Sequence, residues 1–577
     1  MEVLERIAEV DSQLDDTLHP VLRRVYATRG IVRHEELNLE LAGLLPPDQL
    51  KNCREAAQAL FESMQDEQHV LVVGDFDADG ATSCALFISC MKAMGYGKVS
   101  FLVPNRFEYG YGLTPEIVEF ARQQNPDLIV TVDNGIASHE GVLAAARAGI
   151  RVLVTDHHLP GDTLPEAACI LNPNQPGCPF PSKALAGVGV VFYLMSALRS
   201  CLREADWFER QAIPVPNLAG FLDLVALGTV ADVVPLDQNN RRLVKHGLGI
   251  IKSGRGRPGI RALLEVAGRN PASVVASDLA FAAGPRLNAA GRLDDMSLGI
   301  ACLLEDDPGK ARQMAIRLDE LNRDRRQIEQ DMQTEALDVL SHLDVSDADL
   351  LGICLYEAGW HQGVIGILAS RIKERYHRPS IVFADAGVDE KGEAIIKGSA
   401  RSIEGIHIRD VLDALATRYP TLLQKFGGHA MAAGLSIRQA DFAAFAAAFE
   451  EILGSAVDPE DLQKVTWVDG ELTPECFSLD FASLLREGGP WGQHFPEPLF
   501  TGNFEVLSSR VVGEKHLKLT LQPSGSQALI DAIAFNVEPA LLQARLNDVE
   551  LAYRLDVNEF RGQVNPQLMV DQILAYC

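Results

Sequence analysis

Short apolar runs alternate with segments of helical periodicity between about residues 50 and 250. The runs HVLVVGD, KVSFLVP, DLIVTVDNG and IRVLVTDHH are rich in Val, Ile and Leu, whereas segments such as ATSCALFISCMKAMG repeat apolar residues at helical spacing. Continuous apolar runs are typical of strands that are buried on both faces. The alternation therefore predicts a parallel β-sheet that is covered by helices on both faces.

The pattern changes after this region. Helix-forming and charged residues without proline make up GKARQMAIRLDELNRDRRQIEQDMQTEALDVLSHL, which predicts one long connector helix. A second set of strand and helix patterns follows, and the chain after about residue 465 carries short β-like runs that are typical of a small barrel. We therefore predict an α/β protein with a polar, helical N-terminal extension (1–45), a parallel-sheet domain (46–270), a helical connector (271–345), a second α/β domain (346–460) and a C-terminal β-barrel (461–577).

A chain of 577 residues is too long for one hydrophobic core, which agrees with several domains. The sequence has no run of about 18 uncharged apolar residues that would predict a membrane span. Its acidic start, MEVLERIAEVDSQLDD, lacks the features of a signal peptide. The ten cysteines form no CxxC pair, which favours a reducing cytoplasm over a disulfide framework. We expect a cytoplasmic protein.

The net charge of −27 argues, taken alone, against binding to nucleic acid, because phosphate groups attract basic surfaces. An enzyme can nevertheless be acidic overall and basic along one groove. The clusters GRGRPGIR (254–261) and NRDRR (322–326) are basic, although runs of this kind are commonly solvated surface. The overall charge therefore excludes no substrate by itself.

Aspartate and histidine side chains follow the ends of several predicted strands. The first strand runs into DFDADG, two later strands end in VDNG and TDHH, and a further aspartate interrupts the apolar segment GTVADVVPL. Parallel sheets bind ligands at the carboxyl ends of their strands, so these groups are expected to lie close together. The residues concerned are Asp75, Asp77, Asp79, Asp133, Asn134, Asp156, His157, His158 and Asp232.

Carboxylates in such a cluster raise one another's pKa unless positive charge lies among them, and divalent cations would supply that charge. Oxygen ligands together with imidazole suit Mn²⁺ or Mg²⁺, and histidine favours Mn²⁺. Several aspartates with one histidine can hold two ions ~3.5–4 Å apart, an arrangement that hydrolyses phosphate esters. Each motif alone has another interpretation: a calcium-type loop or capped turn for DFDADG, a polar strand end for TDHH, and a helix cap or ion pair for Asp232. Their joint occurrence favours a metal site.

The motifs DFDADG, VDNG, TDHH and GTVADVVPL resemble, in this order, the motifs of the DHH phosphoesterase superfamily. The segment GGHAMAAGLSI (427–437) resembles the DHH-associated domain. GPRLNAAGRLDD (284–295) and the β-rich tail, which resembles an OB-fold, are most similar to the bacterial single-stranded-DNA exonucleases of this superfamily. The resemblance covers nearly the whole chain after about residue 45. It implies a DHH catalytic domain at 46–270, a DHH-associated domain at 346–460 and an OB-fold-like domain at 461–577.

The resemblance also implies roles for single residues. His158 is expected to lie against the scissile phosphate, and Asp75 is expected to contribute to catalysis directly or through water. Many members of the superfamily carry a histidine where this chain has Val73, so either Asp75 replaces it or one ion binds more weakly. The expected ligands of Mn²⁺ or Mg²⁺ are Asp77, Asp79, Asp133, His157 and Asp232.

An exonuclease must recognise a strand end, and a terminal 5′-phosphate is bound best by arginine side chains and backbone N–H groups. A surface or inter-lobe salt bridge is the alternative explanation for any one of the arginines. The resemblance assigns the phosphate pocket to Arg106, Arg286, Arg292, Ser399, Arg401 and His429. His361, at a predicted helix start, is a further candidate for contact with the substrate.

Aromatic and basic residues elsewhere are candidates for further contact with the strand. Three aromatic side chains in FEYGYG can stack on bases, and core packing explains them equally well. They are Phe107, Tyr109 and Tyr111. The candidate phosphate contacts of the tail are Lys515, Lys518, Arg554 and Arg561.

The resemblance implies a metal-dependent 5′→3′ exonuclease that hydrolyses phosphodiester bonds of single-stranded DNA in DNA repair and recombination. It also implies a monomer whose partners are the single-stranded-DNA-binding protein and a RecQ-type helicase. One alternative is a DHH phosphodiesterase for short oligonucleotides or cyclic dinucleotides, a group that typically lacks the β-rich tail. Another is a non-catalytic DNA-binding scaffold, a class that loses the ligands which this chain keeps.

Overall fold

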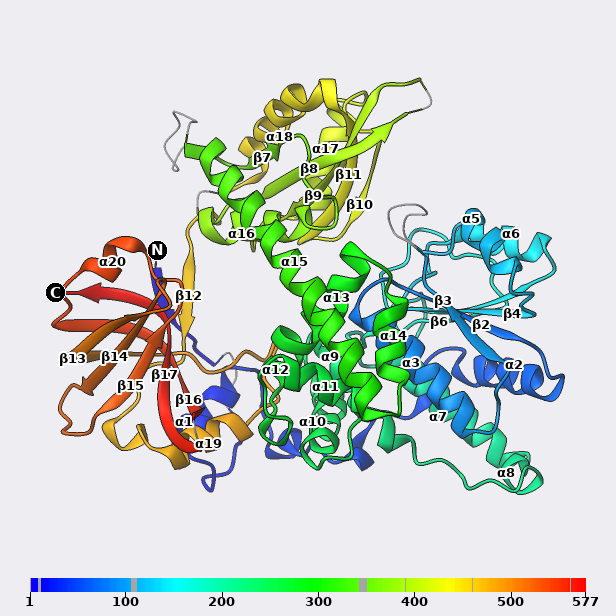
Figure 1. The fold of residues 1–577 in the computed structure, drawn as a ribbon, viewed down its shortest axis with the longest axis horizontal. Helices are drawn as coiled ribbons and strands as arrows, with labels where there is room; N and C mark the ends of the chain where they lie inside the picture. Colours follow the sequence, from blue (N-terminus) through cyan, green and yellow to red (C-terminus); the bar gives the residue numbers. More distant parts are fainter. Residues whose placement is uncertain are drawn as a thin grey trace. The chain divides into compact units, whose positions relative to one another are not determined.

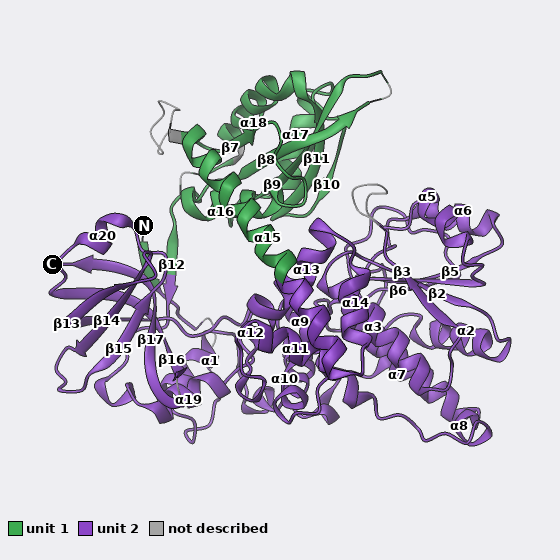
Figure 2. Cartoon of the chain, viewed as in Figure 1, with its two compact units in different colours: residues 1–4, 320–466 green, residues 5–319, 467–577 purple. Residues whose placement is uncertain are grey.

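The structure, a computed structural model, describes residues 2–8, 12–104, 112–341, 350–389, 391–458, 460–560 and 562–577. The chain divides into two compact units (Figure 2). Unit 1 consists of residues 1–4 and 320–466, and unit 2 consists of residues 5–319 and 467–577. Within the described ranges, no helix has both the length and the hydrophobicity that crossing a membrane requires.

Unit 2 contains the predicted parallel sheet, whose strands lie in the order β3 (Val99–Leu102), β2 (Val70–Gly74), β4 (Leu128–Val132), β5 (Arg151–Thr155) and β6 (Cys169–Leu171) (Figure 1). All neighbouring strands are parallel, and β2 and β4 are buried throughout, as their apolar runs predict. One face is covered by α5 (Pro115–Arg122) and α6 (His139–Arg147). The other is covered by α2 (Cys53–Gln65), α3 (Ala78–Ala93) and α7 (Gly187–Glu204).

A helical region follows this sheet. Its elements are α8 (Trp207–Arg210), α9 (Leu222–Ala231), α10 (Gln238–Lys252), α11 (Pro258–Val266), α12 (Ala276–Asp278), the π-helix η6 (Leu279–Ala283), α13 (Gly284–Leu293) and α14 (Ser297–Leu304). The predicted connector is confirmed as α15 (Pro308–Ser341), one helix of 34 residues. Its first part belongs to unit 2 and the remainder to unit 1.

Unit 1 is built on a mixed sheet with the order β10 (Lys425–Gly428), β11 (Ala432–Arg438), β9 (Ala394–Arg401), β8 (Ser380–Val388) and β7 (Ile353–Tyr356). Helices α17 (Ile408–Arg418) and α18 (Phe442–Ala456) share a hydrophobic core with the sheet that includes Phe383 and Phe445. Helix α16 (Ile365–Tyr376) packs with β7, β8 and the end of α15 in a second core. The second α/β domain predicted from the sequence is therefore present.

The C-terminal part of unit 2 is a closed barrel (Figure 1). Its strands lie in the order β13 (Phe500–Val512), β14 (His516–Pro523), β15 (Ile530–Ala534), β17 (Gln563–Tyr576) and β16 (Asp548–Phe560). Along β14 every second residue is buried, as a barrel that is filled by side chains requires. The short helices α19 (Leu479–Glu487) and α20 (Pro539–Gln543) accompany it.

The prediction of a helical N-terminal extension is largely wrong. Among the described residues before 45, only α1 (Pro20–Ala27) is an α-helix, because Pro20 and Gly30 leave room for little more than two turns. A strand, β1 (Glu2–Glu5), pairs with β12 (Val465–Val468) instead. The 3₁₀ turns are η1 (His34–Leu37), η2 (Leu41–Gly43), η3 (Pro47–Gln49), η4 (Leu218–Phe221), η5 (Pro271–Ser273), η7 (Gln439–Asp441) and η8 (Pro474–Cys476).

A buried ion pair joins the N-terminal segment of unit 2 to the segment that leads into the barrel. Arg29, which follows α1, binds Asp469 through both terminal nitrogens, and the two side chains are 1% and 0% exposed. Asp469 also accepts a hydrogen bond from the backbone N–H of Leu499 at 3.0 Å. Removing one partner of such a pair leaves an uncompensated buried charge, which costs far more than the pair itself contributes.

Asp469→Asn is therefore expected to lower the free energy of unfolding of unit 2 by about 3–5 kcal/mol. The matched control is Asp16→Asn, because Asp16 pairs with Arg23 while 93% exposed, where a salt bridge contributes less than about 1 kcal/mol. Urea unfolding, followed by circular dichroism, measures both changes. Equal effects of the two substitutions would contradict the prediction.

Candidate metal centre

The loop between β2 and α3 is organised by its own aspartates. Asp77 is the N-cap of α3, and its Oδ1 accepts hydrogen bonds from the backbone N–H groups of Asp79 at 2.9 Å and Gly80 at 3.0 Å. Asp75 is buried directly after the strand, and its Oδ1 accepts a hydrogen bond from the N–H of Phe76 at 2.8 Å. The first turn of a helix favours negative charge, so the helix helps to hold carboxylates here.

Asp79 points into the interior, where α7 begins. Its two oxygens accept hydrogen bonds from the backbone N–H groups of Gly187 at 2.6 Å and Val188 at 2.9 Å. A Cβ atom at Gly187 would lie 2.7 Å from the Cβ atom of Asp133, which is too close. Glycine at this position therefore allows the start of α7 to approach two carboxylates at once.

The strand β4 supplies Asp133, which is buried and has the left-handed backbone angle φ of 63°. Aspartate and asparagine adopt this conformation more readily than most residues. The next residue, Asn134, donates from Nδ2 to the carbonyl oxygens of Val73 at 3.1 Å and Val132 at 2.9 Å. It thereby ties the end of β2 to the end of β4, and with them the loops that carry the carboxylates.

The strand β5 supplies two histidines that Asp156 holds in place. Its Oδ1 accepts hydrogen bonds from the backbone N–H groups of His157 at 2.7 Å and His158 at 3.1 Å, and it lies 2.7 Å from Nδ1 of His158. Its Oδ2 accepts a hydrogen bond from the N–H of Ile136 at 2.9 Å. Asn174 donates to the carbonyl oxygen of His157 at 2.6 Å. The ring of His158 and the backbone of His157 are therefore fixed by neighbouring hydrogen bonds.

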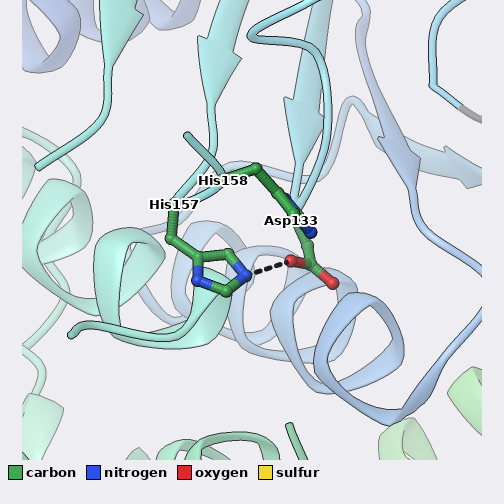
Figure 3. Close-up of side chains that lie close together, drawn as sticks. All are labelled: Asp133, His157 and His158. Carbon is green, nitrogen blue, oxygen red and sulfur yellow. Dashed lines mark ion pairs between the residues drawn. The ribbon is translucent and has the colours of Figure 1, made fainter. Parts of the chain in front are cut away.

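Nε2 of His157 faces the carboxylate of Asp133 (Figure 3). The distances from this atom are 3.1 Å to Oδ1 of Asp133, 3.4 Å to Oδ2 of Asp232 and 3.9 Å to Oδ2 of Asp79. Asp232 lies at the C-terminal end of α9. The structure thus brings carboxylates from three separate elements to one imidazole nitrogen.

The potential ligand atoms form overlapping clusters in which all atoms lie within 4.8 Å of one another. One cluster consists of Asp79, His157 and Asp232, another of Asp75, Asp77 and Asp133, and a third of Asp133, His157 and His158. Asp133 and His157 each belong to two of these clusters.

The carboxylates are electrostatically unfavourable without positive charge. Burial, together with the charge of Asp77, raises the pKa of Asp79 to about 7. Burial and the surrounding carboxylates raise the pKa of Asp133 and the pKa of Asp232 well above the ordinary value for aspartate. A cation among these groups would remove both the repulsion and the desolvation cost.

The two histidines differ in protonation. Burial and the positive charge of His158 lower the pKa of His157 to about 4, so His157 is a neutral imidazole that can ligate a metal. Burial alone would lower the pKa of His158, but the hydrogen bond and charge of Asp156 outweigh it and raise the pKa to about 9. His158 is therefore a cation near neutral pH.

The residues fit a divalent cation. Nε2 of His157 is buried and makes no hydrogen bond of regular geometry within the described residues, while carboxylate oxygens surround it. Several oxygens with one neutral imidazole are the ligand set expected for Mn²⁺ or Mg²⁺.

Two residues of this site were given no role by the sequence analysis. Asp156 was noted only as the end of a strand, although TDHH places a carboxylate beside two histidines. Asn288 on α13 accepts a hydrogen bond at 2.7 Å from the backbone N–H of Ala78, the first residue of α3 after the loop that carries Asp75 and Asp77. The segment GPRLNAAGR contains this asparagine between two arginines, but no pattern in it indicates a partner for the amide.

The predicted phosphate-binding residues lie in both units. In unit 1, Nη1 of Arg401 donates to Oγ of Ser399 at 3.1 Å, and both side chains approach Gly366 in the first turn of α16. His429 is exposed beside the turn between β10 and β11. In unit 2, Arg286 is buried with its Nη2 2.7 Å from Oδ1 of Asp319.

Other predicted contacts are less available or cannot be placed. Lys515 is exposed, but Nζ of Lys518 lies 2.8 Å from Oδ2 of Asp531. Arg554 lies between Glu497 at 3.3 Å and Asp571 at 3.4 Å. Arg292 is half-buried on α13, and Nδ1 of His361 accepts a hydrogen bond from the N–H of Gly363 at 3.0 Å. The predictions outside the described residues concern Arg106, Phe107, Tyr109, Tyr111 and Arg561.

Models of three protein families match the chain. The DHH family, N-terminal domain, matches residues 69–229, the DHHA1 domain matches residues 349–455, and the RecJ OB domain matches residues 468–572. The DHH match contains the loop between β2 and α3 together with His157 and His158. The DHHA1 match contains the mixed sheet of unit 1, and the RecJ OB match contains the barrel.

Curated relatives match over nearly the whole chain. The single-stranded-DNA-specific exonuclease RecJ of Dickeya dadantii is 54% identical over 572 residues, covering 99% of this chain and 98% of that protein. The protein of the same name from Escherichia coli is also 54% identical over 572 residues, covering 98% of each chain. The crystal structure of RecJ in complex with Mn²⁺ from Thermus thermophilus superposes with a TM-score of 0.76 at 31% identity, covering 97% of this chain and 76% of that one. The chain therefore belongs to the RecJ family of DHH proteins.

Proposed function

We propose that this chain is a metal-dependent 5′→3′ exonuclease that hydrolyses phosphodiester bonds of single-stranded DNA and acts in DNA repair and recombination. The observation that carries the proposal is the convergence of Asp79, Asp133 and Asp232 on Nε2 of His157. It occurs in a chain that is 54% identical to exonucleases named RecJ. The closed barrel and its family match favour this activity over a phosphodiesterase for short oligonucleotides or cyclic dinucleotides.

Divalent metal is the cofactor, as relatives crystallised with Mn²⁺ and with Mg²⁺ and the ligand set of this chain indicate. We infer two ions. Asp79, His157 and Asp232 would hold one, Asp75 and Asp77 would hold the other, and Asp133 would bridge them. Many members of the superfamily have a histidine where this chain has Val73. We infer that Asp75 replaces that histidine, because its carboxylate lies in the cluster with Asp77 and Asp133.

Bound divalent cations lower the pKa of water so that hydroxide is available near neutral pH, and they neutralise charge on a phosphate. The chain's own contribution is to hold the carboxylates of Asp77 and Asp79 in place through hydrogen bonds from backbone N–H groups. His157 stays neutral and offers Nε2, while Asp156 fixes the ring of His158 as a cation. We infer that this imidazolium stabilises the negative charge that develops on the scissile phosphate.

The strand end is recognised, we infer, by Ser399 and Arg401 of unit 1. The Ser399 hydroxyl and the Arg401 guanidinium lie at the N-terminal turn of α16, where the helix dipole adds positive potential. A Cβ atom at Gly366 would lie 3.0 Å from Oγ of Ser399 and from Nη2 of Arg401, so glycine permits this close approach. Hydroxyl, guanidinium and helix terminus together suit a terminal phosphate dianion. His429, Arg106 and Arg286 remain proposed contacts.

The single-stranded-DNA-binding protein and a RecQ-type helicase are proposed partners of a monomeric enzyme. Both would supply single strands with ends, which is the substrate that the proposed activity requires.

Asp133→Asn tests the metal centre. The raised pKa means that the folded protein binds a proton on Asp133 more tightly than the unfolded chain does, so the stability of the metal-free protein falls as pH rises above the usual pKa of aspartate. Asparagine keeps the left-handed backbone and removes the charge. Metal-free Asp133→Asn is expected to have a higher Tm than wild type at pH 8 and an equal Tm at pH 4. It should also lose the Mn²⁺-induced rise in Tm and more than ~100-fold of the hydrolysis rate.

Thermal unfolding with and without Mn²⁺, and digestion of end-labelled single strands, measure these effects. The control is Asp162→Asn, which changes an exposed aspartate outside the clusters. Wild-type hydrolysis by Asp133→Asn with excess metal would show that the site is misassigned.

Arg401→Ala tests end recognition. Hydrogen bonds to charged groups contribute ~1.5–3 kcal/mol, so the preference for 5′-phosphorylated over 5′-hydroxyl strands should fall ~10–100-fold in kcat/KM. Arg418→Ala removes an arginine of unit 1 that lies at the end of α17, is half exposed and pairs with Glu451, and should leave the preference intact. An unchanged preference in Arg401→Ala would count against this pocket.

A further inference from the structure

The loop that carries Asp77 and Asp79 depends on a group from elsewhere in the chain. The first four N–H groups of a helix have no partner within the helix. In α3, Oδ1 of Asp77 accepts hydrogen bonds from two of them, those of Asp79 and Gly80. A third, on Ala78, donates to Oδ1 of Asn288 at 2.7 Å. The N–H group between two proposed metal ligands is thus satisfied by a side chain 210 positions away.

The helix α13, which carries Asn288, packs directly against this loop. One turn beyond Asn288, the backbone at Gly291 approaches the carbonyl oxygen of Phe76 so closely that a Cβ atom would overlap it. The helix therefore contacts the loop at Phe76 and at Ala78, on either side of Asp77. Any side chain at position 291 would push the two apart.

The same helix is anchored at its other end. Arg286 donates from Nη1 to the carbonyl oxygen of Ala282 at 2.7 Å, within the π-helix that precedes α13. Its Nη2 lies 2.7 Å from Oδ1 of Asp319 on α15, and both side chains are less than a tenth exposed. Because these contacts are buried, they fix the position of α13 and with it the amide oxygen of Asn288.

We propose that Asn288 is a positioning residue of the metal centre: the hydrogen bond from Ala78 N–H to its amide oxygen fixes the loop so that Asp77 and Asp79 present their carboxylates in the geometry that a cation needs. The inference rests on the proposed function. Without an acceptor at position 288, the Ala78 N–H loses its partner and the loop relaxes away from α13. Groups that orient metal ligands in this way typically contribute 10–100-fold to metal affinity.

Three variants separate this role from a general effect on folding. Asn288→Leu keeps the size of the side chain and removes the acceptor. Asn288→Asp keeps an oxygen in reach of Ala78 N–H. Asn217→Ala is the matched control, since Oδ1 of Asn217 also caps an alanine, accepting from the N–H of Ala219 at 3.2 Å, but on an exposed turn. The probe is Mn²⁺ alone, titrated into the full-length protein by calorimetry, with the Tm of the metal-free protein measured in parallel.

Asn288→Leu is expected to bind Mn²⁺ ~10–100-fold more weakly than wild type, whereas Asn288→Asp stays within about threefold and Asn217→Ala is unchanged. The inference is overturned if Asn288→Leu binds Mn²⁺ within twofold of wild type, even when its metal-free Tm falls. It is also overturned if Asn288→Asp binds as weakly as Asn288→Leu, because the acceptor would then not be the cause.

Failure of the proposed function has a different signature. If the wild-type protein does not bind Mn²⁺, or if Asp133→Asn binds it as tightly as wild type, then the metal centre itself is misassigned. If wild type binds and Asp133→Asn does not, while Asn288→Leu is unaffected, only the role of Asn288 is refuted.

Discussion

Repulsion among buried carboxylates is the constraint that shapes the DHH domain of this chain. Asp79, Asp133 and Asp232 are gathered in the interior, where burial and mutual repulsion raise the pKa of each. Isolated buried carboxylates would simply bind protons and become neutral. The surroundings counter this with backbone N–H groups, which bind both oxygens of Asp79, and with the first turn of α3. These contacts hold the geometry, and cations are needed to complete the charge balance.

The sheet makes the gathering possible. Parallel strands end at one edge, so residues that follow β2, β4 and β5 meet there although they are far apart in sequence. Asn134 ties two of these ends together, and Asp156 orients the histidines at the third. Glycine at 187 lets α7 close the site from the other side. Catalytic geometry therefore depends on backbone packing as much as on the ligands themselves.

The clustering of these aspartates with His157 could be predicted from the sequence, because the motifs that carry them follow apolar runs and the ends of parallel strands meet at one edge of the sheet. Contacts between distant helices leave no such pattern. The hydrogen bond between Asn288 and Ala78 joins two helices that are 210 positions apart in the sequence. No pattern of apolar and polar residues in either segment indicates that the two helices are in contact. An arginine in a sequence indicates charge but not its partner, so the buried ion pair of Arg286 with Asp319 could not be predicted from the sequence. The N-terminal segment was misjudged because its polar composition suits short turns as well as helices.

The same reasoning explains how a chain with a net charge of −27 can act on DNA. In the barrel, Lys518 and Arg554 lie against carboxylates, so these side chains offer little uncompensated positive charge. Each phosphate that a basic side chain neutralises contributes a slope of ~0.7 to the salt dependence of single-strand binding. Lysines and arginines that already form ion pairs within the protein contribute less to this slope than their number suggests. Affinity must then come from other groups, and the proposed end pocket at Arg401 and the proposed metal centre are candidates. An acidic surface elsewhere would repel strands that do not enter these sites, which favours productive binding over general attraction to DNA.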